Sequence, residues 1–328
     1  MYNHLGVSRN FIKKFGKLHV IVPCFNPLRF VSRYILLRDF IRRTVDAGAE
    51  LWVAEVAFGG RPWEVTEGEG RITDETGRSW NQLQFRSKDE IWVKESLINA
   101  AVACLPHDWE YMAWLDGDIN LMNPDWVQET IQQLQHYSVV QMFEQAIDLS
   151  PNGTTMGTFK GVPASLLNGD PWPRTDYYYG KKGYFHPGYG WAYRNYAWHK
   201  MGGLLDINIV GGGDHQMAYG LYGKIDKAIP FKSTQGYRQS VFQWQNNVVD
   251  LKHNVGFVPG TLIHYWHGKK VNRGYFDRWK ILANNNFNPF LDLKKDIYGL
   301  WQLTGNKPKL RDDLRAYFRA RQEDGIDL

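Results

Sequence analysis

Apolar runs alternate with helical patterns along roughly the first 145 residues, and this order constrains the fold more than any other feature. Continuous apolar runs predict buried strands at 18–25, 50–58, 111–115 and 139–149. Helical spacing predicts helices between them at 33–48, 88–105 and 124–137. Such alternation predicts a mostly parallel α/β sheet with right-handed crossovers. Ligands bind these sheets beyond the carboxyl ends of strands, where Asn26, Gly59 and Asp116 stand.

The rest of the chain shows weaker patterns. Residues 61–90 are polar and glycine-rich, so we expect a long loop there, with the hypothesis that it is a lid that orders when a ligand binds. Beyond residue 150 the periodicity loosens, and helices are expected near 274–284, 292–303 and 311–322. These patterns predict an N-terminal segment (1–17), one α/β domain (18–273) and a basic C-terminal helical extension packed on it (274–328).

Composition is that of a soluble globular protein, with 43% hydrophobic and 22% charged residues. No run approaches the roughly 20 apolar residues that span a bilayer, and the first 17 residues lack the apolar core of a signal peptide. We therefore expect a soluble cytoplasmic protein, in the host cytoplasm if its source is viral. Cys24 and Cys104 lie in apolar surroundings and are predicted to be buried free thiols.

Two aspartates one residue apart, Asp116 and Asp118, follow the predicted strand at 111–115. Carboxylates this close repel each other unless a cation or a proton lies between them. Hard divalent cations such as Mg²⁺ and Mn²⁺ take oxygen ligands and share them with substrate phosphates. The alternative is an aspartate-rich turn, and on this segment alone the two readings are equally good.

A second acidic position, Asp214, follows three glycines, Gly211 to Gly213. Glycine lets a substrate approach the backbone closely, so Asp214 could be a carboxylate base aimed at that substrate. The alternative is the N-cap of the helix predicted to begin there, a position that aspartate favours strongly.

His264 and His267 flank Tyr-Trp late in the chain, and three bases follow them, Lys269, Lys270 and Arg273. On an extended strand residues three apart face opposite sides, so only one of the two histidines is expected to complete a metal site. The bases would meet phosphate oxygens. Residues 265–328 hold 13 Lys and Arg against 8 Asp and Glu, which favours an anionic partner near this end.

Taken in order, these motifs resemble the GT-A glycosyltransferases, and most closely the β-1,4-galactosyltransferase and polypeptide N-acetylgalactosaminyltransferase group. The resemblance rests on "VIVPCFNP", "WVKESLIN", "WLDGDINLMNPDW", "HPGYGWAYRNYAWHKMGGLLD", "VGGGDHQ" and the late histidines, and it spans roughly residues 18–275. The chain departs from the family in lacking the arginine near Pro23. Gly213 stands where a glutamate is usual and Val210 where a tryptophan is usual, which leaves the acceptor open.

The resemblance implies a GT-A fold and a role for each matched residue. Asp214 would be the catalytic carboxylate, and Asp116 and Asp118 would hold Mn²⁺ or Mg²⁺ with His267 or His264. Tyr189, Trp191, Gly212 and Gly213 would face the acceptor, because sugar faces suit aromatic rings. The donor would be bound by Pro23, Phe25, Asn26, Glu55, Trp92, Lys94, Asp116, Lys269, Lys270 and Arg273.

The function that this resemblance implies is transfer of a sugar from a nucleotide-sugar donor, a UDP-sugar first, to an acceptor hydroxyl. The acceptor would be a glycan or protein, or a hydroxylated base in phage DNA, whose backbone the bases of 307–321 could follow. A solvated helical face is the other reading of those bases. Alternatives for the whole chain are a non-catalytic nucleotide-sugar-binding relative and a nucleotidyltransferase, although "PCFNPLRF" lacks the glycine-rich phosphate loop expected of the latter.

Overall fold

The central sheet carries the candidate site, and its strands come mainly from the first half of the chain. The computed structural model describes residues 16–172 and 185–325. Within them an eight-stranded sheet has the order β12-β7-β11-β5-β1-β2-β4-β3. Its strands, from edge to edge, are Val255–Phe257, Val139–Gln141, Gly190–Arg194, Tyr111–Leu115, Leu18–Phe25, Glu50–Phe58, Ser79–Ser87 and Gly70–Thr73. Only β11 and β3 run antiparallel to their neighbours, so the predicted mostly parallel α/β sheet is confirmed.

A second sheet has five strands in the order β10-β9-β8-β13-β6. Its strands are Phe185–His186, Thr155–Gly161, Gln145–Leu149, Thr261–His264 and Ile119–Leu121. Strand β6 follows the Asp-Gly-Asp segment directly and pairs antiparallel with β13, with Ile119 opposite His264. This register brings the aspartates and the late histidines together, although they are far apart in the sequence.

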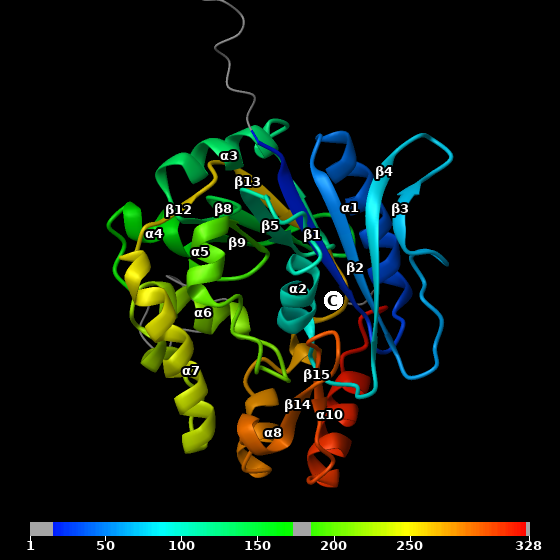
Figure 1. Ribbon diagram of the computed structural model, residues 1–328, viewed down its shortest axis with the longest axis vertical. Coiled ribbons are helices and arrows are strands. Elements are labelled where there is room, and N and C mark those ends of the chain that lie inside the picture. The colour runs from blue at the N-terminus through cyan, green and yellow to red at the C-terminus, as the bar shows by residue number, and fades with distance from the viewer. Residues whose placement is uncertain (1–15, 173–184, 326–328) are drawn as a thin grey trace, which may run out of the picture.

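Alternation of side chains along the central strands gives the sheet an apolar surface on both faces, as buried parallel sheets require. On one face Val20, Val22 and their neighbours pack against α1 (Val31–Asp46) and α3 (Trp126–His136). On the other, Ile21 and Phe25 join a core with α2 (Lys94–Val102), α5 (Asn195–Met201), α6 (Gly213–Leu221) and α7 (Gln235–Val248). Figure 1 shows α1 and α2 on either side of β1 and β2. The short helix α4 spans Val162–Leu167.

The C-terminal extension packs on the same core. It contains α8 (Arg278–Asn284), α9 (Pro289–Asp292), the hairpin β14 (Leu293–Lys295) and β15 (Trp301–Leu303), and α10 (Pro308–Ala320). Phe318 of α10 lies with its ring centroid 5.7 Å from that of Phe25. The boundary near residue 273 stays a prediction, and the predicted segment 1–17 lies almost wholly outside the described residues.

Several predicted elements differ from the structure. Residues 61–90 are not one long loop, because β4 buries Trp80, Gln82, Phe85 and Ser87 and extends the sheet with β3. The run at 139–149 is divided between β7 and β8, which belong to different sheets. The helix expected at 292–303 is the hairpin β14–β15, whose turn is held by Asp296, since its side chain accepts from the amides of Tyr298 and Leu300.

Two further expectations concern cysteines and membranes. Cys24 is a buried free thiol, but Cys104 is exposed at the end of α2 and is not the buried thiol that was predicted. None of the helices in the described ranges 16–172 and 185–325 combines the length and apolar character of a membrane span.

Candidate active site

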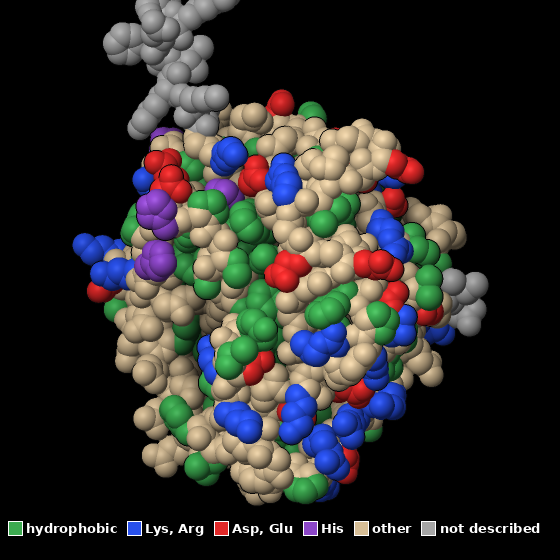
Figure 2. Space-filling model, turned by 45° about the vertical axis from the view of Figure 1, so that its right-hand side comes forward, with side chains coloured by type: hydrophobic (Ala, Val, Ile, Leu, Met, Phe, Trp, Pro, Cys, Tyr) green, Lys and Arg blue, Asp and Glu red, His purple; other side chains and the backbone are tan. Residues whose placement is uncertain are grey.

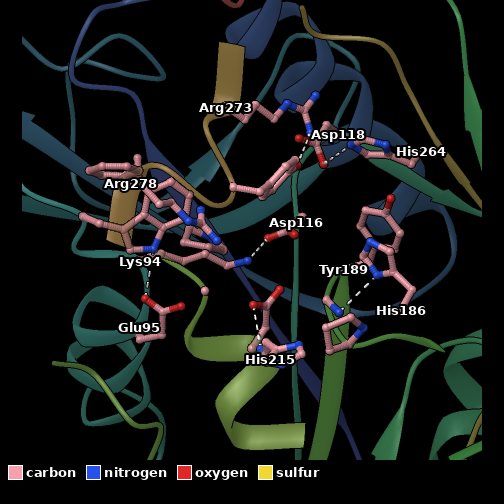
Figure 3. A pocket seen from close by; sticks show the side chains of 18 of the residues that line it. Lys94, Glu95, Asp116, Asp118, His186, Tyr189, His215, His264, Arg273 and Arg278 are labelled. Carbon is pink, nitrogen blue, oxygen red and sulfur yellow. Dashed lines mark hydrogen bonds and ion pairs between the residues drawn. The ribbon is translucent and has the colours of Figure 1, made fainter. Parts of the chain in front are cut away.

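A pocket opens at the carboxyl ends of β1 and β5, where the parallel sheet predicts a ligand site. Pro23 and Phe25 of β1 line it, together with the Asp-Gly-Asp segment after β5. The start of α2, the loop before β11, the loop before α6 and the segment from β13 to α8 form much of the remaining wall. Figure 3 shows Asp116 and Asp118 on one side of this pocket, with Lys94 and Glu95 of α2 facing them.

Asp118, His264 and His267 form a buried cluster whose ligand-type atoms all lie within 4.8 Å of one another. Nε2 of His267 is 3.1 Å from Oδ2 of Asp118, and the Nε2 atoms of the two histidines are 3.2 Å apart. The expectation that the histidines face opposite sides is wrong, because β13 ends at His264 and His267 lies beyond the strand. The amide of Tyr265 donates to the carbonyl oxygen of Asp118 and fixes this arrangement.

Each of these histidines has a carboxylate behind it. Nδ1 of His264 lies 2.8 Å from Oδ1 of Asp148, and Nδ1 of His267 lies 3.3 Å from Oε2 of Glu323. A proton on Nδ1 that is donated to a carboxylate leaves the Nε2 lone pair free for a metal, which is the usual arrangement of metal-ligating histidines. Asp148 is itself held by Tyr189, whose hydroxyl donates to Oδ1 at 2.6 Å, and by Lys270.

The donor set fits a divalent cation. Oδ1 of Asp118 is buried and has no hydrogen-bond partner among the described residues, and its nearest counter-group is Nε2 of His264 at 3.9 Å. A buried oxygen of this kind needs an ion or a donor. Burial opposes ionisation of Asp118, but His267 and Arg33 hold the pKa of this carboxyl well below its ordinary value. Burial and the Arg273 guanidinium lower the pKa of His267, while the Asp118 carboxylate opposes the shift.

Asp116 lies outside this cluster. Its carboxylate forms an ion pair with Lys94, whose Nζ also lies 4.5 Å from the centroid of the Trp114 ring. Burial raises the pKa of Asp116 against the opposing charge of Lys94. Burial alone would lower the pKa of Lys94, but the carboxylates of Asp116, Asp214 and Glu95 together raise it above its ordinary value. The ammonium group is therefore retained at neutral pH.

Cationic side chains surround the cluster. Nη1 of Arg33 donates to Oδ2 of Asp118 at 2.9 Å, and Nη2 of Arg273 donates to Nε2 of His267 at 3.0 Å. Arg278 and Arg321 line the same pocket. Nε of Arg278 is buried without a hydrogen-bond partner in the described part of the chain. The wall beside the candidate metal site is thus suited to an anion.

Asp214 lies in the first turn of α6 and lines the pocket. The N-cap position belongs to Gly212, whose φ of 87° is left-handed and favours glycine, so the N-cap reading of Asp214 is wrong. Asp214 also lies against the backbone of the loop before β11, since a Cβ at Gly188 would come within 2.5 Å of Oδ2 of Asp214. The Asp214 carboxylate can occupy this position because Gly188 has no side chain.

The other predicted residues divide into two groups. Besides Pro23, Phe25, Asp116 and Asp118, the pocket is lined by Trp92, Lys94, Tyr189, Gly212, His264, His267 and Arg273. Six predicted residues do not line it: Asn26, Glu55, Trp191, Gly213, Lys269 and Lys270. Glu55 accepts from the amides of Glu64 and Val65, and Asn26 exchanges hydrogen bonds with the backbone of Phe30. These two side chains hold loops next to the pocket.

Sequence reasoning missed several residues that the fold brings into the pocket. Arg33, Glu95, His186, Arg278 and Arg321 line it, and Glu323 lies behind His267. Glu95 was the most accessible to prediction, because it follows Lys94 in a segment already singled out. Burial raises the pKa of Glu95 to about 7, with Lys94 opposing the shift and Asp214 adding to it.

No protein-family model matches the chain, and no curated protein does. Solved structures match at low similarity. The catalytic domain of Drosophila β1,4-galactosyltransferase 7 in complex with xylobiose is 12% identical, with a TM-score of 0.35, over 74% of this chain and 65% of that one. A complex of the galactosyltransferase LgtC with donor and acceptor sugar analogues is 10% identical, with a TM-score of 0.33, over 81% of this chain and 95% of that one.

A third match has another activity. The 4-diphosphocytidyl-2C-methyl-D-erythritol synthase of Anaerococcus prevotii is 12% identical, with a TM-score of 0.30, over 75% of this chain and 89% of that one. Sugar transferases of the kind that the sequence motifs resemble are therefore among the structures that match. The chain spans 65% of the length of the Drosophila catalytic-domain chain that it matches.

Proposed function

We propose that the protein is a metal-dependent glycosyltransferase that moves a sugar from a nucleotide-sugar donor to an acceptor hydroxyl. The observation that carries the proposal is the buried cluster of Asp118, His264 and His267, in a pocket lined by arginines and by Asp214. One carboxylate oxygen of Asp118 has no hydrogen-bond partner within residues 16–172 and 185–325. A cation site beside an anion site suits a substrate that bears a diphosphate.

Asp118, His264 and His267 would hold the cation. Two imidazoles and one carboxylate favour Mn²⁺ over Mg²⁺, because Mg²⁺ prefers oxygen ligands and keeps more of its waters. A bound divalent cation neutralises the charge that grows on the diphosphate as the bond to the sugar breaks. Asp116 is proposed to act through its ion pair with Lys94.

The diphosphate would be held by the cations of the pocket wall. Arg273 donates to Nε2 of His267 in this structure, and a cation bound at that nitrogen leaves the guanidinium to an anionic oxygen. Arg278 lies against the loop before α6, where a Cβ at Gly212 would come within 2.9 Å of its Nη2. Phe25 and Trp92, with ring centroids 5.1 Å apart, offer an apolar surface for the nucleoside, for which uridine is the first choice.

Asp214 is the proposed catalytic carboxylate. If the reaction inverts the anomeric carbon, Asp214 accepts the proton of the acceptor hydroxyl as that oxygen forms its bond to the sugar. If the reaction retains configuration, Asp214 positions the acceptor or stabilises positive charge on the sugar. Tyr189 and the glycine at 212 would border the acceptor. A glycan or protein acceptor and a hydroxylated DNA base are both compatible with this surface.

The nucleotidyltransferase alternative has less support. A phosphate loop after β1 would use the first amides of α1, but Asp324 already accepts hydrogen bonds from the amides of Val31 and Ser32, at 3.1 and 2.8 Å. A non-catalytic relative would have no need of Asp214 in the pocket.

Thermal unfolding with UDP-, GDP- and CMP-sugars, each with and without Mn²⁺, tests the proposal. We expect one nucleotide family to raise Tm only with Mn²⁺, and we expect Asp118→Asn to abolish that rise because it removes a ligand charge. No Mn²⁺-dependent rise with any donor would contradict the proposal, and an equal rise in Asp118→Asn would place the metal elsewhere.

A further inference from the structure

The chain after α10 returns to the candidate metal site. Residues 321–325, here called the C-terminal segment, leave the end of α10 and run to the start of α1, as the red ribbon in Figure 1 shows. The elements that it reaches carry Arg33 and His267, both of which contact Asp118. The last described part of the chain therefore lies against the candidate metal site.

Hydrogen bonds anchor the C-terminal segment on both sides of the site. On one side Asp324 caps α1 through the amides of Val31 and Ser32, and the Ser32 hydroxyl donates to the carbonyl oxygen of Glu323 at 3.0 Å. On the other side the Trp266 indole donates to the carbonyl oxygen of Gly325 at 2.8 Å. These bonds join the beginning of α1 to the residues just after β13.

Glu323 lies at the centre of this arrangement with only 4% of its surface exposed. Its Oε2 is 3.3 Å from Nδ1 of His267 and 3.5 Å from Nη1 of Arg33, while Oε1 accepts from Nε of Arg321. A buried carboxylate is tolerated only when it is paired and hydrogen-bonded, so these contacts define its position closely. Arg321 in turn lies over the ring of Trp92, with its guanidinium carbon 5.3 Å from the centroid.

We propose that Glu323 is a positioning residue for the metal site, and that the C-terminal segment is the element that presents it. The inference rests on the proposed function, because it assumes that His267 is a metal ligand. Nη1 of Arg33 lies 3.2 Å from Nδ1 of His267, and both nitrogens face the same carboxylate oxygen of Glu323. Glu323 would accept the Nδ1 proton of His267 as well as pairing with Arg33, fix the ring, and leave Nε2 facing Asp118. Asp148 stands in the same relation to His264, so both imidazoles would be oriented by a carboxylate.

The test is direct titration of the protein with Mn²⁺, followed by the EPR signal of the free ion, with no donor or acceptor present. Removing such a carboxylate typically weakens metal binding by about 10–100-fold, and we expect a loss of at least about ten-fold for Glu323→Gln. Glu90→Gln is the matched control. Glu90 is also paired with arginines, including Arg319 of α10 at 3.0 Å, but it does not line the pocket, so its loss should leave Mn²⁺ affinity unchanged.

A second variant, Glu323→Asp, tests the proposal if Glu323→Gln fails to fold. Glu323→Asp keeps the charge near Arg321 but withdraws the carboxylate from His267, so we expect a folded protein that binds Mn²⁺ several-fold more weakly than the wild type. With Co²⁺ in place of Mn²⁺, the visible spectrum of the bound ion should also change in this variant, because the spectrum reports ligand geometry.

The outcomes separate this inference from the proposed function. Wild-type affinity in Glu323→Asp or in a folded Glu323→Gln, with an unchanged Co²⁺ spectrum, overturns the positioning role and leaves the metal site in place. A wild-type protein that binds no Mn²⁺ overturns the metal site and this inference together. An equal loss of affinity in Glu90→Gln also overturns the inference, since the effect would then not depend on contact with His267.

Discussion

Asp118 has one carboxylate oxygen paired with Arg33 and His267 and the other without a hydrogen-bond partner among the described residues. Its neighbour Asp116, two positions away, is instead bound to Lys94. The two aspartates of one short motif therefore have different partners, one set suited to a cation and the other to holding a lysine in the pocket. The residue type alone therefore does not predict the role of either aspartate. The groups that each carboxylate contacts determine what it can bind.

Glu95 gives a prediction at the same scale, on stability against pH. Burial raises its pKa to about 7, above the ordinary 4.5, so the folded state binds this proton more tightly than the unfolded chain does. Its contribution to the free energy of unfolding is fully present below about pH 4.5 and is lost as the pH rises to 7 and above. Glu95→Gln should remove this pH dependence and exceed the wild type in stability at pH 8 by up to about 3 kcal/mol.

Urea unfolding of the wild type and Glu95→Gln at pH 5 and pH 8 measures this difference. Glu75→Gln, at an exposed glutamate between β3 and β4, is the control and should follow the wild type at both values. A Glu95→Gln protein that is less stable than the wild type at pH 8 would show that the carboxylate is ionised and stabilising in the folded state.

At the scale of helices and strands, the position of β13 in the second sheet brings together the cluster of Asp118, His264 and His267. Its antiparallel pairing with β6 brings the residues after β13 beside Asp118, and α1 supplies Arg33 from its first turn. The extension contributes through α10, whose residues Leu310, Leu314 and Phe318 are buried in the core beneath the pocket. We therefore expect the extension and the sheet to unfold as one unit.

Leu314→Ala tests this expectation. Leu314 has no exposed surface, so its truncation should lower the free energy of unfolding by about 2–5 kcal/mol while thermal unfolding keeps a single transition. Leu291→Ala on α9, where the side chain is 63% exposed, is the control and should change stability little. Two separate transitions in the variant would show that residues beyond 273 form an independent unit.

Across the whole molecule, basic side chains gather over the C-terminal elements at the lower end in Figure 2. This positive charge is largely neutralised by nearby carboxylates. Each of the six bases named for polyanion binding pairs with a carboxylate: Lys307 with Asp292, Lys309 with Asp313, Arg311 with Asp312, Arg315 and Arg319 with Glu90, and Arg321 with Glu323. This pairing favours a solvated helical face over a surface that follows DNA, except at Arg321, which is buried and lines the pocket.

Sequence patterns predicted the parts of the molecule in which neighbouring residues determine the structure. The buried strands at 18–25, 50–58 and 111–115 and the aspartates after β5 belong to this class. Strand β4 was missed because its alternating polar residues resemble a loop when the partner β2 is unknown. Arg33 and Glu323 were missed because each enters the site through tertiary packing that no local spacing encodes.

The most direct test of the proposed function is release of nucleoside diphosphate from nucleotide sugars by the wild type in Mn²⁺. We expect slow release with one donor family even without an added acceptor, because water then takes the place of the acceptor hydroxyl. Release should stop after the metal is removed by a chelator and be at least about a hundred-fold slower from Asp118→Asn, since a metal ligand is lost. Asp125→Asn is the control. Asp125 is an exposed aspartate just before α3, so this variant should match the wild type. Release that persists in the chelator or in Asp118→Asn would contradict a metal-dependent glycosyltransferase.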